Sequence, residues 1–170
     1  MTIFIGIDQS FTSTGYCVIR DNEVLDFGVF KTAIHDGDIH DRANIIVNNI
    51  TALCNNYKDF KFSMEGLSFG QRGSATRDLA GLQFIIINYI RFQLNILDIN
   101  IISPKSIKKL ATGSGGSSKV KVTKTMMVHS LPDEIKALFK TKYKTSTGLY
   151  DVTDAYYLAK YNQSISTNFK

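Results

Sequence analysis

Cysteine is scarce in this chain of 170 residues, which contains two, Cys17 and Cys54. Neither has a second cysteine or a histidine at ligand spacing, so we expect no disulfide or zinc site and two small core residues in a reducing compartment. The chain also lacks an apolar run long enough to cross a bilayer, and its N-terminus is typical of a strand rather than of a secretory leader. These absences predict a soluble, cytoplasmic protein with no membrane partner.

Acidic residues are nearly absent from residues 101–144, where ten lysines stand against only Asp133 and Glu134. That segment carries a net charge of +8, and because the whole chain carries +5, the rest carries −3. A lysine field concentrated in one part of a compact domain is typical of a protein that binds a polyanion, most often nucleic acid. The alternative is a lysine-rich surface that serves only solubility.

The order of the predicted elements indicates an α/β protein, and a hydrophobic content of 44% over residues 1–170 suits a single domain. Strands are expected at residues 3–8, 16–20, 24–30, 60–64 and 99–102. Helices are expected at residues 43–57, 79–94 and 104–110, from Lys119 onward, and at 133–140 and 150–161. The short turn after Arg20 makes the first three strands antiparallel, and the helical crossovers make the last two parallel. The result is a mixed five-stranded sheet with helices on both faces.

The helix predicted over residues 79–94 is apolar on almost every side. Such a helix is buried on more than one side. In a protein of this size, the second burying surface is either another subunit or the centre of the core, and the pattern alone leaves both open.

Four acidic residues are candidates for one metal site. Asp8 and Glu65 each end a buried strand, and Asp151 and Asp154 share one flank of the last helix, where acids more commonly serve as N-terminal caps. If the two strands are neighbours and the last helix crosses them, four carboxylates converge, and a divalent cation is the simplest way to stabilise them. Oxygen ligands favour Mg²⁺ or Mn²⁺, and two ions about 3.5–4 Å apart can cleave a phosphodiester.

Several motifs together resemble the RuvC-type Holliday-junction resolvases. They are Ile5-Gly6-Ile7-Asp8-Gln9-Ser10 with Thr14-Gly15-Tyr16, Met64-Glu65, Leu79-Ala80-Gly81, Pro104-Lys105-Ser106-Ile107-Lys108-Lys109 and Asp151-Val152-Thr153-Asp154-Ala155. The resemblance implies a ribonuclease H-like fold, a homodimer, and cleavage of four-way DNA junctions by paired nicks with two Mg²⁺ ions, for which Mn²⁺ can substitute. Departures such as Gln9-Ser10, in place of the family's proline-glycine, are similar to divergent, phage-type members.

The resemblance also implies roles for single residues. Asp8 would bridge the metal ions, Glu65 and Asp154 would each hold one, and Asp151 would complete the site or orient water. Lys121, with Lys119 as the alternative, matches the basic residue that stabilises charge on the scissile phosphate. The aromatic expected three residues after the second acid is replaced by Ser68, and Phe69 either stacks on an unpaired base or packs. The residues expected to contact DNA are Phe69, Arg72, Arg77, Lys105, Lys108, Lys109, Lys119, Lys121 and Lys124.

Other functions remain as alternatives at this point. A flap or branched-DNA endonuclease would use the same site, and a non-catalytic module that binds branched DNA would keep only the lysines. The first glycine-containing motif also resembles the phosphate loop of actin-like ATPases and sugar kinases. Those proteins need a duplicated domain and a second such loop, for which 170 residues leave no room.

Overall fold

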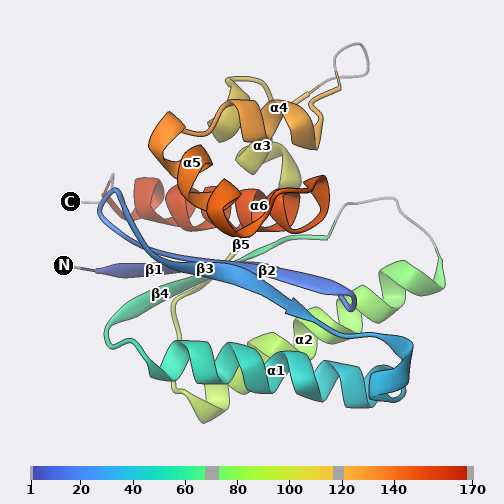
Figure 1. Ribbon diagram of the computed structural model, residues 1–170. Helices are drawn as coiled ribbons and strands as arrows, with labels where there is room; N and C mark the ends of the chain where they lie inside the picture. The colour runs from blue at the N-terminus through green and yellow to red at the C-terminus, as the bar shows by residue number, and fades with distance from the viewer. Residues whose placement is uncertain (1, 68–72, 117–120, 168–170) are drawn as a thin grey trace.

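A five-stranded mixed sheet forms the centre of the computed structural model, which describes residues 2–67, 73–116 and 121–167 (Figure 1). The strands are β1 (Ile3–Asp8), β2 (Ser13–Arg20), β3 (Glu23–Lys31), β4 (Phe60–Glu65) and β5 (Ile99–Ile102). Their order across the sheet is β3-β2-β1-β4-β5. The pairs β1–β2 and β2–β3 are antiparallel, whereas β1–β4 and β4–β5 are parallel. The predicted sheet is therefore confirmed in strand number and direction.

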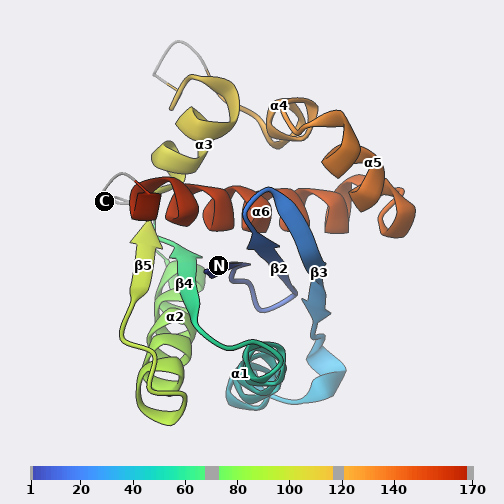
Figure 2. The same ribbon diagram turned by 90° about the vertical axis from the view of Figure 1, so that its left-hand side faces the viewer.

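Helices cover both faces of the sheet, as predicted (Figures 1 and 2). On one face lie α1 (Ile39–Asn55) and α2 (Ser74–Gln93). The other face carries α6 (Ser146–Thr167), with α3 (Pro104–Thr112), α4 (Lys124–His129) and α5 (Asp133–Lys142) packed beyond it. A short 3-10 turn, η1 (Ile34–Asp36), precedes α1. Each layer has its own apolar core, so the sheet is buried on both faces.

Several element boundaries differ from the sequence prediction. Strand β2 begins at Ser13, not at residue 16, and α2 begins at Ser74, not at residue 79. The helix expected to open at Lys119 begins instead at Lys124, because the Thr123 side chain caps it by accepting a hydrogen bond from the Met126 amide at 3.2 Å. Lys119 itself lies outside the described residues. Helix α6 begins at residue 146, so the two aspartates lie within it and do not cap it.

Helix α2 is buried on one side only within this chain. Its buried positions are Leu82, Ile86 and Ile90, whereas Phe84 and Phe92 are 71% and 73% exposed. Within one chain this helix is buried on one side, so the alternative of a central core helix is excluded. Burial of its second side by another subunit stays a prediction. The apolar outer face remains without a covering element among the described residues.

The cysteines are placed as predicted. Cys17 and Cys54 are free and buried, one in each core. Within the described residues, no helix combines the length and apolar character needed to span a membrane.

Two glycines let α6 lie directly against the sheet. A Cβ atom on Gly6 would stand 2.6 Å from the Ala159 amide nitrogen and would also overlap the Ala155 carbonyl oxygen. A Cβ atom on Gly15 would stand 2.6 Å from the carbonyl carbon of Asp151. Any side chain at these positions would push the helix away. The backbone of α6 therefore approaches β1 and β2 beside the strand end that carries Asp8, which pairs with Gly15.

Candidate carboxylate site

Two of the four predicted acids end neighbouring parallel strands. Asp8 is the last residue of β1 and Glu65 the last of β4, and the preceding residues Ile7 and Met64 are partners in the ladder. Parallel strands end at the same edge of a sheet, so both carboxylates lie at that edge. The end of β4 is held by two side-chain amides, because Gln9 and Gln83 donate to the Glu65 carbonyl oxygen at 2.8 and 2.7 Å.

The other two acids come from α6. Asp151 and Asp154 stand three residues apart and therefore face the same side of the helix. The Ser13 hydroxyl, at the start of β2, donates a hydrogen bond to Asp151 Oδ2 at 2.5 Å. Strand β2 thus helps to orient Asp151, while the contacts at Gly6 and Gly15 place the whole helix.

The pKa values of three of the carboxylates are raised by burial and by the charges of neighbouring acids. Burial raises the pKa of Asp8 well above its usual value, and the charges of Asp154, Glu65 and Asp151 raise it further. Burial, followed by the charge of Asp154, raises the pKa of Glu65 to about 7. Burial also raises the pKa of Asp154, and Lys124 opposes that rise. A cluster of mutually repelling carboxylates, of which Asp154 is buried and the other three are half-buried, needs a cation to stay ionised at neutral pH.

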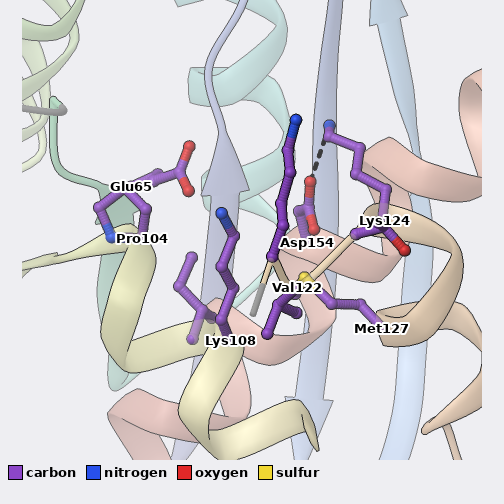
Figure 3. Close-up of a pocket in the computed structure, with 10 residues that line it drawn as sticks. Glu65, Pro104, Lys108, Val122, Lys124, Met127 and Asp154 are labelled. Carbon is purple, nitrogen blue, oxygen red and sulfur yellow. Dashed lines mark ion pairs between the residues drawn. The ribbon is translucent and has the colours of Figure 1, made fainter. Parts of the chain in front are cut away.

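Lys124 supplies one positive charge to this cluster. Its Nζ lies 2.8 Å from Asp154 Oδ2, and the two side chains are 52% and 10% exposed (Figure 3). Lys124 is the first residue of α4, so the Thr123 cap that starts this helix also places the ammonium group. From the sequence, Lys124 was predicted only to contact DNA. Its pairing with Asp154 depends on how α4 packs against α6, for which the sequence carries no local signal.

A cavity of about 460 Å³ opens beside the carboxylates. Figure 3 shows Glu65, Lys108 and Lys124 reaching it from β4, α3 and α4. The complete lining is Glu65, Pro104, Ile107, Lys108, Lys121, Val122, Thr123, Lys124, Met127 and Asp154. The lining brings two carboxylates and three lysines together, which suits a phosphate group held next to a metal site.

The donor set fits a hard divalent cation. Carboxylate oxygens are the ligands that Mg²⁺ and Mn²⁺ prefer, and the repulsion at Asp8 and the ammonium group on Asp154 both mark a position for positive charge. As the side chains stand, no three His, Cys, Asp or Glu residues of the described chain form a closed ligand set. The Lys124 ammonium group is the cation that Asp154 holds in this arrangement.

The remaining predicted DNA contacts fall into separate places. Lys105 and Lys109 are exposed on α3, on the same helix as Lys108, and Lys121 is exposed at the mouth of the cavity. Arg77 is exposed on α2 and lines a different cavity, between α1 and α2, so the structure does not bring it to the carboxylates. Phe69, Arg72 and Lys119 lie outside the described residues.

Three polar residues that support the site were not predicted from the sequence. Ser13 orients Asp151, and Gln9 and Gln83 hold the end of β4. For Gln9, its position directly after Asp8 was a usable signal. Ser13 and Gln83 meet their partners only through the packing of α6 and α2, and nothing local in the sequence indicates that.

Comparison with known proteins gives consistent matches. A family model described as crossover junction endodeoxyribonuclease RuvC matches residues 4–142. The RuvC of Orientia tsutsugamushi (strain Boryong) is 29% identical over 167 residues, which is 96% of this chain and 98% of that protein. The RuvC of Chloroherpeton thalassium is 31% identical over 144 residues, which is 80% of this chain and 74% of that protein.

A solved structure shares the fold. T. thermophilus RuvC in complex with Holliday junction substrate superposes with a TM-score of 0.75 at 16% identity, and the match covers 99% of this chain and 96% of that one. At this identity the likeness shows the ribonuclease H-like fold alone. The family model ends before Asp151, whereas the alignment with the Orientia protein spans nearly the whole chain.

Proposed function

Because the chain belongs to the RuvC family of crossover junction endodeoxyribonucleases, we propose that it resolves four-way DNA junctions by paired, metal-dependent hydrolysis of phosphodiester bonds. The observation that carries the proposal is the placement of Asp8 and Glu65 at the ends of neighbouring parallel strands, with Asp151 and Asp154 on the helix whose backbone lies against β1 and β2. A surface that only bound DNA would gain nothing from four acids beside a polyanion. The lysines that line the same cavity would supply the grip on the phosphate backbone.

Nucleases of this family depend on a metal ion. For this chain the proposed metal is Mg²⁺, as two ions, with Mn²⁺ able to substitute. Asp8 is the proposed shared ligand, because the charges of the other three acids all raise the pKa of its carboxylate. Glu65 and Asp154 would each hold one ion, and Asp151, fixed by Ser13, would complete the site or orient water. When bound, the ions stabilise the attacking and leaving oxygens of the displacement.

The proposed task of the lysines is to place and neutralise the phosphate. Lys121 lines the cavity and is the proposed partner of the charge that develops on the scissile phosphate, with Lys119 as the alternative outside the described residues. Lys105, Lys108 and Lys109 on α3 would contact neighbouring phosphates, which positions the strand without reading its sequence.

The proposed working unit is a homodimer, in which residues 1–170 of each copy form one nuclease domain. Two nicks on opposite strands need two sites, and one copy provides one carboxylate cluster. The exposed Phe84, Ile85 and Phe92 give α2 an outer apolar face of the kind that contacts between subunits bury. The proposed place of action is the cytoplasm.

Cleavage of matched substrates tests the proposal. An immobile four-way junction, a Y-shaped flap and a plain duplex of the same sequence are incubated with the protein in Mg²⁺, and each strand is labelled in turn. We expect symmetric nicks in the junction and little cutting of the duplex. Faster cutting of the flap would keep the site but change the substrate, and junction binding without cleavage in Mg²⁺ or Mn²⁺ would leave only a DNA-binding module.

A further inference from the structure

We propose that Lys124 is a built-in counter-ion of the carboxylate cluster, which occupies Asp154 in the metal-free protein and has to leave it before the metal binds. This inference rests on the proposed function, because it takes Asp154 to be a metal ligand. As a consequence, Lys124 raises the concentration of divalent metal at which the site fills. It also reduces the cost of charge repulsion among the carboxylates when metal is absent.

The first support is the position of the ammonium group. Lys124 Nζ lies 2.8 Å from Asp154 Oδ2, and the Asp154 side chain is only 10% exposed. The ammonium group therefore occupies a lone-pair direction that a metal ion would need. No other ion pair of Lys124 or Asp154 occurs within the described part of the chain. A metal ion that approaches this oxygen from the same direction therefore has to displace the ammonium group.

The second support is the reach of this charge over the cluster. Burial raises the pKa values of Asp8, Glu65 and Asp154, and Lys124 opposes that rise in all three. Lys108 opposes it in Glu65 and Asp154. The charge of Lys124 therefore favours the ionised form of these three carboxylates, in addition to its direct contact with Asp154.

The third support is that Lys124 is free to move. Its side chain is 52% exposed and carries a flexible four-carbon stem, and it lines the cavity that opens to solvent. Leaving Asp154 requires only a change of rotamer, not a movement of α4. The freed ammonium group would remain in the cavity, close to the proposed place of the DNA phosphate.

Binding of Mn²⁺ without DNA tests the competition directly. Free Mn²⁺ is measured by electron paramagnetic resonance during titration of the full chain, for wild type, Lys124→Met and Lys121→Met. The second variant removes a lysine that lines the same cavity but forms no ion pair among the described residues, so it measures the general effect of losing one positive charge. Asp8→Asn shows which Mn²⁺ binding belongs to the carboxylate site.

We expect Lys124→Met to bind Mn²⁺ about three- to tenfold more tightly than wild type, as the loss of a half-exposed competing ion pair requires. Lys121→Met should change the affinity by less than about twofold. Equal tightening in both variants, or none in Lys124→Met, would overturn the inference while leaving the metal site in place. If Asp8→Asn binds as much Mn²⁺ as wild type does, the proposed metal site is overturned, and this inference with it.

Thermal unfolding provides a second readout that does not depend on activity. In EDTA, Lys124→Met should melt below wild type, because Asp154 loses its only ion pair among the described residues. Added Mn²⁺ should raise its melting temperature by more than it raises that of wild type. A melting temperature in EDTA equal to or above that of wild type would contradict the counter-ion role.

Discussion

Placing a methyl group on Gly6 should shift α6 away from the sheet while the rest of the fold stays intact. In Gly6→Ala the new Cβ would stand 2.6 Å from the Ala159 amide nitrogen and 3.0 Å from Leu158 Cβ, and it would overlap the Ala155 carbonyl oxygen. These are mainly backbone atoms, so no side chain can turn aside and the helix has to shift. Overpacking of this kind costs about 1–3 kcal/mol, which corresponds to a fall in melting temperature of about 2–12 °C for a chain of this size.

The effect on cleavage should exceed the effect on stability. Asp154 directly precedes Ala155 on α6, so a shift of the helix moves this carboxylate relative to Asp8. A misplacement of about 1 Å in a catalytic site can cost about 100-fold in rate. The measurements are thermal unfolding and Mg²⁺-dependent junction cleavage at a temperature where the variant remains folded.

Gly81→Ala is the matched control. Gly81 lies on α2, and a Cβ there would meet nothing within 4 Å. Replacing a helical glycine by alanine should therefore stabilise the protein by about 0.5–1 kcal/mol. If Gly6→Ala kept both wild-type stability and wild-type cleavage, the close contact between α6 and β1 would be refuted as the feature that positions the site.

Two further predictions concern single contacts of the site. Ser13→Ala removes the hydroxyl that donates to Asp151, so metal-dependent cleavage should fall about 10- to 100-fold with little change in melting temperature, and an unchanged rate would show that Asp151 needs no such support. The pKa of Glu65 is raised to about 7, so in EDTA its contribution to stability is complete below about pH 4.5 and is lost as the pH rises through about 7. Urea unfolding of wild type should show the free energy of unfolding falling across this range. The fall should be smaller in Glu65→Gln by about 3 kcal/mol. Identical pH profiles of the two proteins would contradict the burial of this carboxylate.

The sheet could be predicted from the sequence because its signals are local. Short β-branched runs, the turn at Asp21-Asn22 and the alternation of strands with helices determine strand number and direction. The residues at the strand ends, Asp8 and Glu65, follow from the same pattern, since each carboxylate ends a buried run. The boundaries at Ser13 and Ser74 were missed because both segments open with small polar residues that carry no periodic apolar signal.

The remainder of the site depends on contacts between distant segments. The ion pair between Lys124 and Asp154 joins α4 to α6, and the Ser13 hydrogen bond joins β2 to α6. Gly6 and Gly15 allow α6 to lie close to the sheet, but a glycine in a strand pattern is consistent with many kinds of close approach. The sequence alone therefore did not predict this contact. Conversely, the apolar sequence of α2 indicated two buried sides, and one chain buries only one of them.

If the carboxylates of β1, β4 and α6 form one metal-dependent centre for cutting DNA junctions, removing one of them should abolish cleavage and leave junction binding intact. The most direct test is the single-turnover rate at which wild type and Asp8→Asn cleave an immobile four-way junction in Mg²⁺, measured together with junction binding. We expect the variant to bind the junction as well as wild type does but to cleave it about a thousandfold more slowly or not at all, because metal stabilisation of the displacement supplies several kcal/mol. Cleavage by Asp8→Asn at a rate close to that of wild type would show that these carboxylates do not form the cutting centre.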